Sequence, residues 1–416
     1  MNLSNSFKLA LRGLLINKGR SLLTLLGIII GIAAVITITA LAEGLRAQAT
    51  KQIDELGTNL IFVFPQMSTK ESRSQSGRRG SWEPQFFTER EVRAIEASLR
   101  VPTVVNASVQ EQANVTRGRE SVSVTTAGVD EHYNEVFNFK METGRFFTPG
   151  EVSGGRRVAI LGWQTAKDLF GSQNPLGGVV EINKERFEVI GVVSEMGGGL
   201  GENQDKAAYV PLKVAQQHLF GLGDKIQILV LQTQNLGDVP TVKDDVKRAL
   251  NRVRRISDPD DENYMIMTQT EALKNFGQFI NVLTMVLGGV AAVSLLVGGI
   301  GIMNIMLVNV TERTREIGLR KAVGARQIDI LFQFLIEAVV LCLLGGIIGM
   351  GLGYLGAIGL SALISKALPE ASWSPVMNLT SVVIAVVFSS LIGLIFGVYP
   401  AANAARKDPI TALRYE

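Results

Sequence analysis

The chain has 416 residues, of which 47% are hydrophobic and 19% charged, with 41 Lys and Arg against 38 Asp and Glu. This apolar content excludes disorder as the dominant state, and the single cysteine, Cys342, excludes a scaffold held by disulfides. A net charge of +3 argues against nucleic-acid binding, which usually requires a strong basic excess. A mean hydropathy of +0.24 leaves a membrane protein or a very apolar globular enzyme.

Four long segments without charged residues decide between these two classes. Because a helix needs about 20 apolar residues to cross the hydrocarbon core, we predict transmembrane helices at 21–43, 280–310, 328–362 and 378–400. The second charge-free run is longer than one crossing requires, so we expect its helix to continue beyond the membrane over 268–279. The first segment could instead be a cleaved signal peptide, but its apolar run is about twice as long as such signals use.

Basic residues are concentrated in the short segments on one side of the predicted membrane. They occur in the N-terminal segment 1–20, in the loop 311–327 and in the tail 401–416, whereas the loop 363–377 carries only Lys366. The positive-inside rule therefore places both termini in the cytoplasm of a multi-pass cell-membrane protein. Within 1–20, apolar residues share one helical face opposite the basic residues, which favours an interfacial helix, or equally the flank of a signal anchor.

Residues 44–279 then form a large periplasmic or extracellular domain of α+β type. Short segments rich in β-branched residues predict strands at 59–64, 121–129, 157–161, 185–193 and 225–233. Helices are predicted at 87–99, 163–171 and 242–255, and Thr88 and Glu91 have the spacing of a capping box. We expect stalk helices at both ends of this domain, where the chain leaves the first span and enters the second.

The sequence offers no pattern for catalysis, for a cofactor or for a metal. A phosphate-binding GxxxxGK[ST] loop is excluded because Gly is nowhere followed by Lys. His132 and His218 are far apart, whereas zinc sites need closely spaced ligands, and Cys342 lies within a predicted span as a small packing residue. We therefore expect that the chain is not an enzyme, and that any energy source is a separate protein.

The loop 311–327 is the best candidate for docking such a protein. Glu316 and Arg320 are spaced i, i+4, which favours a short helix in an otherwise basic segment. An ordinary positive-inside loop is the simpler interpretation of the loop taken by itself.

Four segments together resemble the permease of MacB-type ABC transporters, which carries an FtsX-like domain. The most specific is GIMNIMLVNVTERTREIGLRKAVGARQIDILFQFLIEAVVL (301–341). RSLLTLLGIIIGIAAVITITALAEG (20–44) and GLIFGVYPAANAARKDPITALRYE (393–416) resemble the first and last spans of this family. LGTNLIFVFP (56–65) resembles the start of its extracytoplasmic domain.

The resemblance implies a homodimer of four-span permeases flanked by two ATPases, which bind the ATP and Mg²⁺. MacB carries its ATPase domain at the N-terminus, but only about twenty residues precede the first span here, so the expectation is a stand-alone permease with a separate ATPase. Motion of the ATPase would be transmitted to the extracytoplasmic domain, and substrate would be expelled with a membrane-fusion adaptor and an outer-membrane duct. Membrane lipid is the only other expected partner.

The resemblance also implies roles for individual residues. The coupling helix and its turn against the ATPase would be formed by Glu312, Arg313, Glu316, Ile317, Gly318, Arg320, Lys321, Gly324 and Ala325. Gly345, Gly349 and Gly353 repeat every four residues, which permits close helix contact within one subunit or across a dimer. Glu337 is an acid inside a span region and is expected to face protein or the cytoplasmic interface.

Two alternative functions fit the same family pattern. One is the release of lipoproteins from the membrane, and the other is a regulator that transports nothing and activates a cell-wall hydrolase outside the cell. A neighbouring gene for an adaptor would indicate export, whereas one for a hydrolase would indicate regulation. The sequence carries no mark of the substrate.

Overall fold

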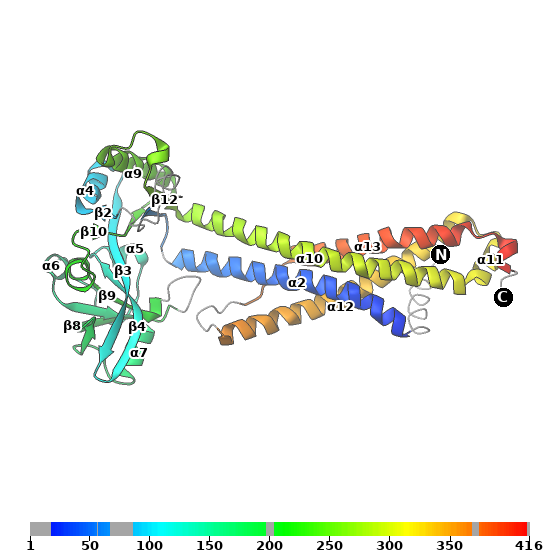
Figure 1. Cartoon of the computed structure of the whole chain (residues 1–416), viewed down its shortest axis with the longest axis horizontal. Coiled ribbons are helices and arrows are strands. Elements are labelled where there is room, and N and C mark those ends of the chain that lie inside the picture. Colours follow the sequence, from blue (N-terminus) through cyan, green and yellow to red (C-terminus); the bar gives the residue numbers. More distant parts are fainter. Residues whose placement is uncertain (1–17, 56, 67–85, 197–203, 368–373, 414–416) are drawn as a thin grey trace, which may run out of the picture. The chain divides into compact units, whose positions relative to one another are not determined.

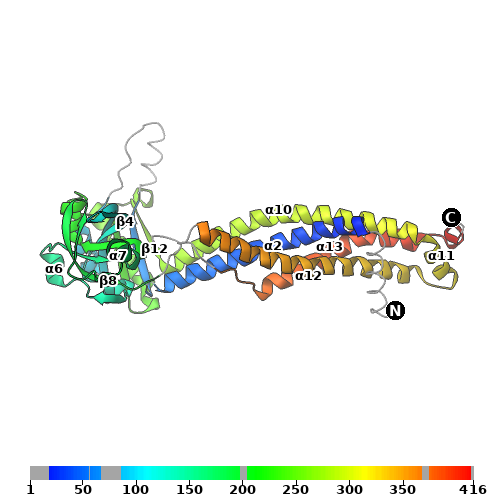
Figure 2. The same cartoon turned by 90° about the horizontal axis from the view of Figure 1, so that it is seen from below.

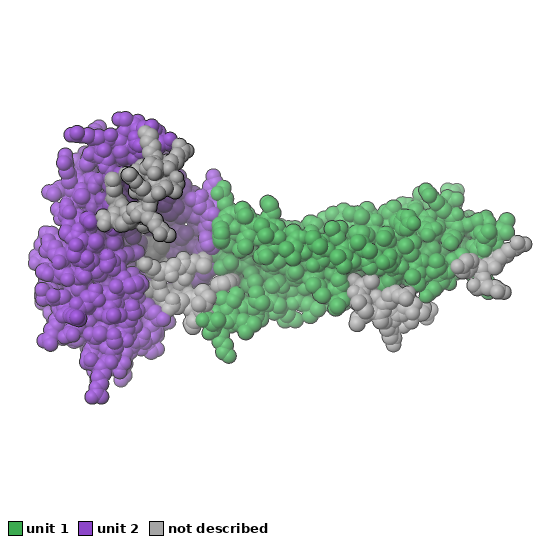
Figure 3. Space-filling model, in the orientation of Figure 1, with its two compact units in different colours: residues 1–47, 277–416 green, residues 48–276 purple. Residues whose placement is uncertain are grey.

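The computed structural model describes residues 18–55, 57–66, 86–196, 204–367 and 374–413. The chain divides into two compact units, which Figure 3 distinguishes by colour. The helical unit comprises residues 1–47 and 277–416, and the sheet unit comprises residues 48–276. The expected interfacial helix at 1–20 lies outside the described residues as far as position 17, and residues 18–20 already belong to the first long helix.

Four long apolar helices account for the predicted spans (Figures 1 and 2). They are α2 (Lys18–Glu55), α10 (Gln269–Glu312), α12 (Gln327–Ala367) and α13 (Leu379–Arg406). Each is long and apolar enough to cross a membrane. At 1.5 Å per residue the 44 residues of α10 extend about 66 Å, roughly twice the hydrocarbon thickness, and the predicted continuation over 268–279 is helical from Gln269 onward.

The helix ends differ from the boundaries expected from charge alone. Helix α12 continues to Ala367, because neither Gly nor Pro occurs between Leu360 and Ala367 to end it earlier. The first residues of the expected loop 363–377 are therefore helical. On the opposite side, the expected loop 311–327 contains a helix, α11 (Thr314–Ala322), and the tail contains another, α14 (Pro409–Leu413).

Glycines set the close approach of α2 to α12. A Cβ at Gly353 would lie 2.6 Å from the carbonyl oxygen of Ala33, and one at Gly349 would lie 2.9 Å from that of Ile29. A Cβ at Gly345 would lie 3.1 Å from the side chain of Ile28. The glycine repeat of α12 therefore packs against α2 of the same chain, and the missing side chains let the two backbones approach closely.

The sheet unit is built on a ten-stranded sheet in the order β12-β1-β11-β3-β4-β9-β6-β8-β5, with β7 pairing to β3 and β8. Its strands are β1 (Leu60–Pro65), β3 (Thr103–Arg117), β4 (Glu120–Val129), β5 (Met141–Gly144), β6 (Val158–Leu161), β7 (Val179–Ile182), β8 (Glu185–Val193), β9 (Ala207–Pro211), β11 (Ile228–Thr233) and β12 (Tyr264–Thr268). Pairs β4–β9 and β6–β8 are parallel, and the other pairs are antiparallel. β2 (Phe87–Thr88) and β10 (Lys225–Ile226) form a separate small ladder.

Helices cover this sheet over three apolar clusters. Helices α4 (Glu89–Ser98) and α9 (Val239–Arg254) enclose one cluster with β1 and β11, α7 (Trp163–Phe170) covers a second, and α5 (Tyr133–Phe137) and α6 (Pro149–Ser153) cover a third. A buried ion pair between Glu91 and Arg254 links α4 to α9. Glu91 also accepts a hydrogen bond of 2.8 Å from the Thr88 amide, so the predicted capping box is present. The expected α+β architecture is confirmed.

Candidate functional site

The candidate site is α11, the short helix between α10 and α12. Helix α10 ends at Glu312, and Arg313 leaves the helical conformation with φ −98° and ψ 14° before α11 begins. After α11, Gly324 adopts φ +104°, a conformation that favours glycine. Asp329 then accepts a hydrogen bond of 3.1 Å from the Arg326 amide and caps the start of α12. The local sequence therefore dictates a helix bounded by two tight turns.

Ion pairs and hydrogen bonds join α11 to α12. The Arg313 Nη1 atom lies 3.3 Å from Oε2 of Glu337, whose side chain is only 3% exposed. Arg320 donates a hydrogen bond of 2.7 Å to the buried Gln333 and forms a short ion pair with Glu316. Glu337 thus faces a protein counter-charge, as a buried carboxylate requires. Arg313 and Arg320, two of the residues expected at the ATPase contact, therefore also make contacts within the chain that hold α11 in place.

A second set of contacts joins α11 to α13 and α14. The Lys321 ammonium donates hydrogen bonds of 2.6 and 2.7 Å to the carbonyl oxygens of Ala405 and Lys407 at the end of α13. A Cβ on Gly318 would lie 2.8 Å from the Cβ of Ala412, so glycine lets α14 pack directly on α11. Ile317 is buried in the core of the helical unit. α11 is therefore fixed to three helices of its own unit.

The outward face of α11 contains residues that the sequence did not single out. Leu319 is 57% exposed, Val323, the residue that directly follows α11, is 82% exposed, and Ile410 on the neighbouring α14 is 67% exposed. Glu312, Glu316 and Gly324 also lie on the exposed surface, whereas Ala325 is half-buried. The i, i+4 spacing of Leu319 and Val323 in a basic helix was the available signal for this face.

The described residues hold no group of three or more His, Cys, Asp or Glu that could bind a metal. Nδ1 of His132 lies 3.8 Å from Glu135 on the exposed surface, and Cys342 is buried among apolar residues of the helical unit. The contacts described above for the helical unit are ion pairs, hydrogen bonds and close packing between its helices.

Two family models match the chain. The model described as MacB-like periplasmic core domain matches residues 21–249, and the one described as FtsX-like permease C-terminal matches residues 288–409. The uncharacterized ABC transporter permease YknZ of Bacillus subtilis is 38% identical over 416 residues, which cover all of both chains. The macrolide export ATP-binding/permease protein MacB of Bdellovibrio bacteriovorus is 38% identical over 405 residues, 96% of this chain and 60% of that protein.

The chain therefore spans the full length of one curated relative and 60% of the length of the other. Among solved structures, the extracellular domain of YknZ from Gram-positive bacteria is 25% identical and covers 50% of this chain and 100% of that one, with a TM-score of 0.42. The periplasmic region of MacB from Actinobacillus actinomycetemcomitans is 20% identical and covers 55% of this chain and 96% of that one, with a TM-score of 0.44.

Both units thus correspond to family domains, the sheet unit and first span to the core-domain model and the remaining helices to the permease model. A relative matched along its entire length is itself an ABC transporter permease. The chain belongs to the MacB and FtsX-like family of ABC transporter permeases, as a membrane protein with four candidate spans and a large α+β extracytoplasmic domain.

Proposed function

We propose that the chain is the permease subunit of an ABC-type export system, and that a separate ATPase docks on α11 and drives it. The observation that carries the proposal is that α11 is attached to other helices of its unit and also exposes apolar side chains. It is fixed to α12, α13 and α14 through Glu337, Ala405 and Ala412, yet it exposes Leu319 and Val323. A protein that binds this face and moves α11 must also move the helices attached to it.

The distribution of charge supports the required orientation. The segments 1–20, 311–327 and 401–416 are basic, which favours a cytoplasmic position for both termini and for α11. In that orientation α11 meets proteins of the ATP-containing compartment. ATP and Mg²⁺ bind to the partner ATPase, and this chain itself catalyses no reaction.

Helix α10 is the proposed transmission element. At its first residue, the Gln269 side chain donates hydrogen bonds of 2.9 and 3.0 Å to the carbonyl oxygens of Ile53 and Gly57, where α2 ends. Glu271 accepts a hydrogen bond of 2.9 Å from the Thr268 amide, which caps this end of α10. Its last residue, Glu312, directly precedes the turn into α11. Motion of α11 would therefore reach the sheet unit through one unbroken helix.

We also propose a homodimer that works with a membrane-fusion adaptor and, in cells with two membranes, an outer-membrane duct. The outward residues Met285, Val286, Val290 and Val293 of α10 are strongly exposed and apolar, so they suit either lipid or a second copy. The name of the MacB relatives, macrolide export proteins, favours export over lipoprotein release or hydrolase regulation for this chain.

Association with an ATPase tests the proposal. The intact permease would be co-expressed in turn with each candidate ATPase of the same genome, recognised by a GxxxxGK[ST] loop, and purified through a tag on the permease. We expect one ATPase to co-purify and to change its ATP hydrolysis rate when the permease is present. Val323→Asp should reduce this association at least about tenfold, because it places a charge in an apolar contact.

Leu236→Asp is the matched control, since Leu236 is a similarly exposed apolar residue of the sheet unit. It should leave association unchanged. If no ATPase associates with the wild-type permease, or if Val323→Asp binds as well as the control, the docking role of α11 is wrong. A separate experiment distinguishes export from lipoprotein release and from hydrolase regulation. Export predicts that an adaptor co-purifies with the permease and that deletion of the gene abolishes export of a substrate.

A further inference from the structure

The first residues of β3 present an unpaired strand edge inside the sheet unit. On one side, β3 pairs with β11 from Thr103 to Ser108. On the other side, its pairing with β4 begins only at Ser108, because β4 ends at Val129 and the chain turns into α5. Among the described residues, therefore, no strand pairs with 103–107 on the side of β4.

Hydrogen bonds show which peptide groups face the vacant side. Ala107 donates a hydrogen bond of 2.8 Å from its amide to Oδ2 of Asp130, the residue that follows β4. Even-numbered positions face the opposite side, as shown by the bond of 2.7 Å from the Gln110 amide to the Gln227 side chain. Because peptide groups alternate along a strand, Val105 and Thr103 face the same side as Ala107. No hydrogen bond joins the amides of these two residues to another described residue on that side.

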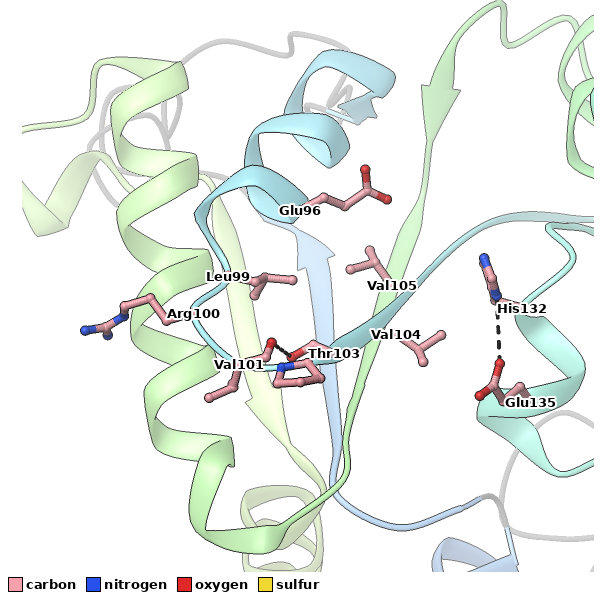
Figure 4. Close-up of a pocket in the computed structure, with 10 residues that line it drawn as sticks. Glu96, Leu99, Arg100, Val101, Thr103, Val104, Val105, His132 and Glu135 are labelled. Atoms are coloured by element: carbon pink, nitrogen blue, oxygen red, sulfur yellow. Dashed lines mark hydrogen bonds and ion pairs between the residues drawn. The ribbon is translucent and has the colours of Figure 1, made fainter.

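A groove runs along this edge between α4 and α5 (Figure 4). Its volume is about 610 Å³, and its walls include Glu96, Leu99, Val104, Val105, His132 and Glu135. Glu96 belongs to α4, whereas His132 and Glu135 lie at the start of α5 and within it. Apolar side chains such as Leu99 and Val104, together with the polar backbone edge, match what an extended peptide chain binds.

The charge of the groove favours a basic occupant. The guanidinium of Arg100 points away from the other labelled side chains in Figure 4 and lies 2.8 Å from Asp245 of α9, which neutralises it. Glu96 and Glu135 are exposed carboxylates on opposite walls, and His132 lies 3.8 Å from Glu135. The acidic side chains of the groove therefore outnumber its available basic ones.

We propose that this groove binds an extended segment of another extracytoplasmic polypeptide, which adds a strand to Thr103–Val105 and places Lys or Arg side chains beside Glu96 and Glu135. Strand addition satisfies the unpaired edge, and alternate side chains of the segment contact the two walls. The partner is thus recognised outside the membrane through its backbone and its positive charge. The inference goes beyond the proposed coupling to an ATPase, since it requires none.

A peptide probe tests this inference on the full-length protein in detergent. The probe is a fluorescein-labelled, capped hexapeptide of sequence Lys-Lys-Val-Val-Lys-Lys, with binding followed by fluorescence anisotropy. Because neighbouring side chains of a strand point to opposite faces, its adjacent lysines can reach both walls of the groove. We expect saturable binding that becomes at least about tenfold weaker in the double variant Glu96→Lys/Glu135→Lys. The matched control, Glu111→Lys/Glu120→Lys, changes the same charge at exposed positions of β3 and β4 and should bind as the wild type does.

Two further measurements separate strand addition from adsorption by charge. The same peptide with every backbone amide N-methylated keeps its charge but cannot donate to a strand, so it should not bind. Hydrogen exchange of the wild-type protein should show that the probe protects the amides of Thr103 and Val105. Absence of saturable binding, equal binding of the methylated peptide, or unchanged exchange at these amides would each overturn the inference.

Discussion

Replacing Arg313 by methionine should destabilise the helical unit strongly, because it leaves the Glu337 carboxylate buried without its counter-charge. Among the described residues, Arg313 provides the basic group that pairs with Glu337. Its Nη1 atom lies 3.3 Å from Oε2 of Glu337, whose side chain is 3% exposed. Removing one member of a buried ion pair costs about 3–5 kcal/mol. At about 2–4 °C per kcal/mol for a domain of this size, the melting temperature should fall by roughly 6–20 °C.

The only cysteine provides the assay. Cys342 is buried in the helical unit, so a thiol-reactive fluorescent dye reports when this unit opens as the detergent-solubilised protein is heated. The control Arg315→Met removes an exposed arginine two residues away and should shift the melting temperature by no more than about 2 °C.

The double variant Arg313→Met/Glu337→Met completes the thermodynamic cycle. It should recover most of the lost stability, because replacing both members of a buried pair by apolar residues is often neutral or stabilising. If Arg313→Met melts like Arg315→Met, or if the double variant loses the sum of the two single losses, the two side chains do not stabilise each other and the reasoning is wrong.

Three further outcomes follow from the same contacts. Gly353→Leu should lower the melting temperature and Gly351→Leu should not, because a Cβ at Gly353 would lie 2.6 Å from Ala33 of α2 whereas one at Gly351 meets nothing within 4 Å. Lys321→Met should lower it by removing charged hydrogen bonds to two carbonyl groups at the end of α13, at a cost of about 1.5–3 kcal/mol each. In the sheet unit, hydrogen bonds from Arg145 lower the pKa of Glu151 from 4.5 to about 2. Because this folded-state pKa lies below the unfolded value, the carboxylate stabilises the fold above pH 4.5, and the contribution is lost as the pH falls toward 2. At pH values above 4.5, the amides of α6 should exchange more slowly in the wild-type protein than in the variant Glu151→Gln. This difference should disappear as the pH falls from 4.5 toward 2.

The elements that the sequence predicted are those with an uninterrupted pattern. The four spans follow from runs without charge. β8 has the predicted bounds 185–193, because residues 185–190 alternate in burial and the β-branched residues that follow are buried. β3 was missed, since the polar residues 110–112 in its middle break the pattern of a strand. There, β4 pairs with all three residues, and the Gln227 side chain accepts a hydrogen bond from the Gln110 amide. The predicted strand at 225–233 is divided at Gln227, which uses its side chain to pair with the Gln110 amide. Tertiary partners, which a single sequence does not reveal, decide such positions.

The candidate site was located by its motif, but the motif did not separate inward from outward residues. Gly318 and Lys321 are oriented by α14 and by the end of α13, which lie about ninety residues away in sequence and could not be paired with α11 beforehand. The predicted set contained both charged and uncharged residues of this block, but it did not include Leu319 and Val323, which the structure leaves exposed.

This division changes how the coupling loop has to be tested. An alteration of the whole stretch 316–321 removes Arg320 from Gln333 and Lys321 from the end of α13, so a loss of ATPase coupling would not distinguish docking from helix packing. Val323 has an exposed side chain, and its replacement therefore changes the outer surface at little expected cost in stability. A permease carrying Val323→Asp that melts like the wild type and has lost its ATPase assigns docking to the outer face of α11. In a permease carrying Lys321→Met, the ATPase could remain bound while its ATP hydrolysis no longer drives export. That result would assign transmission to the inner face of α11.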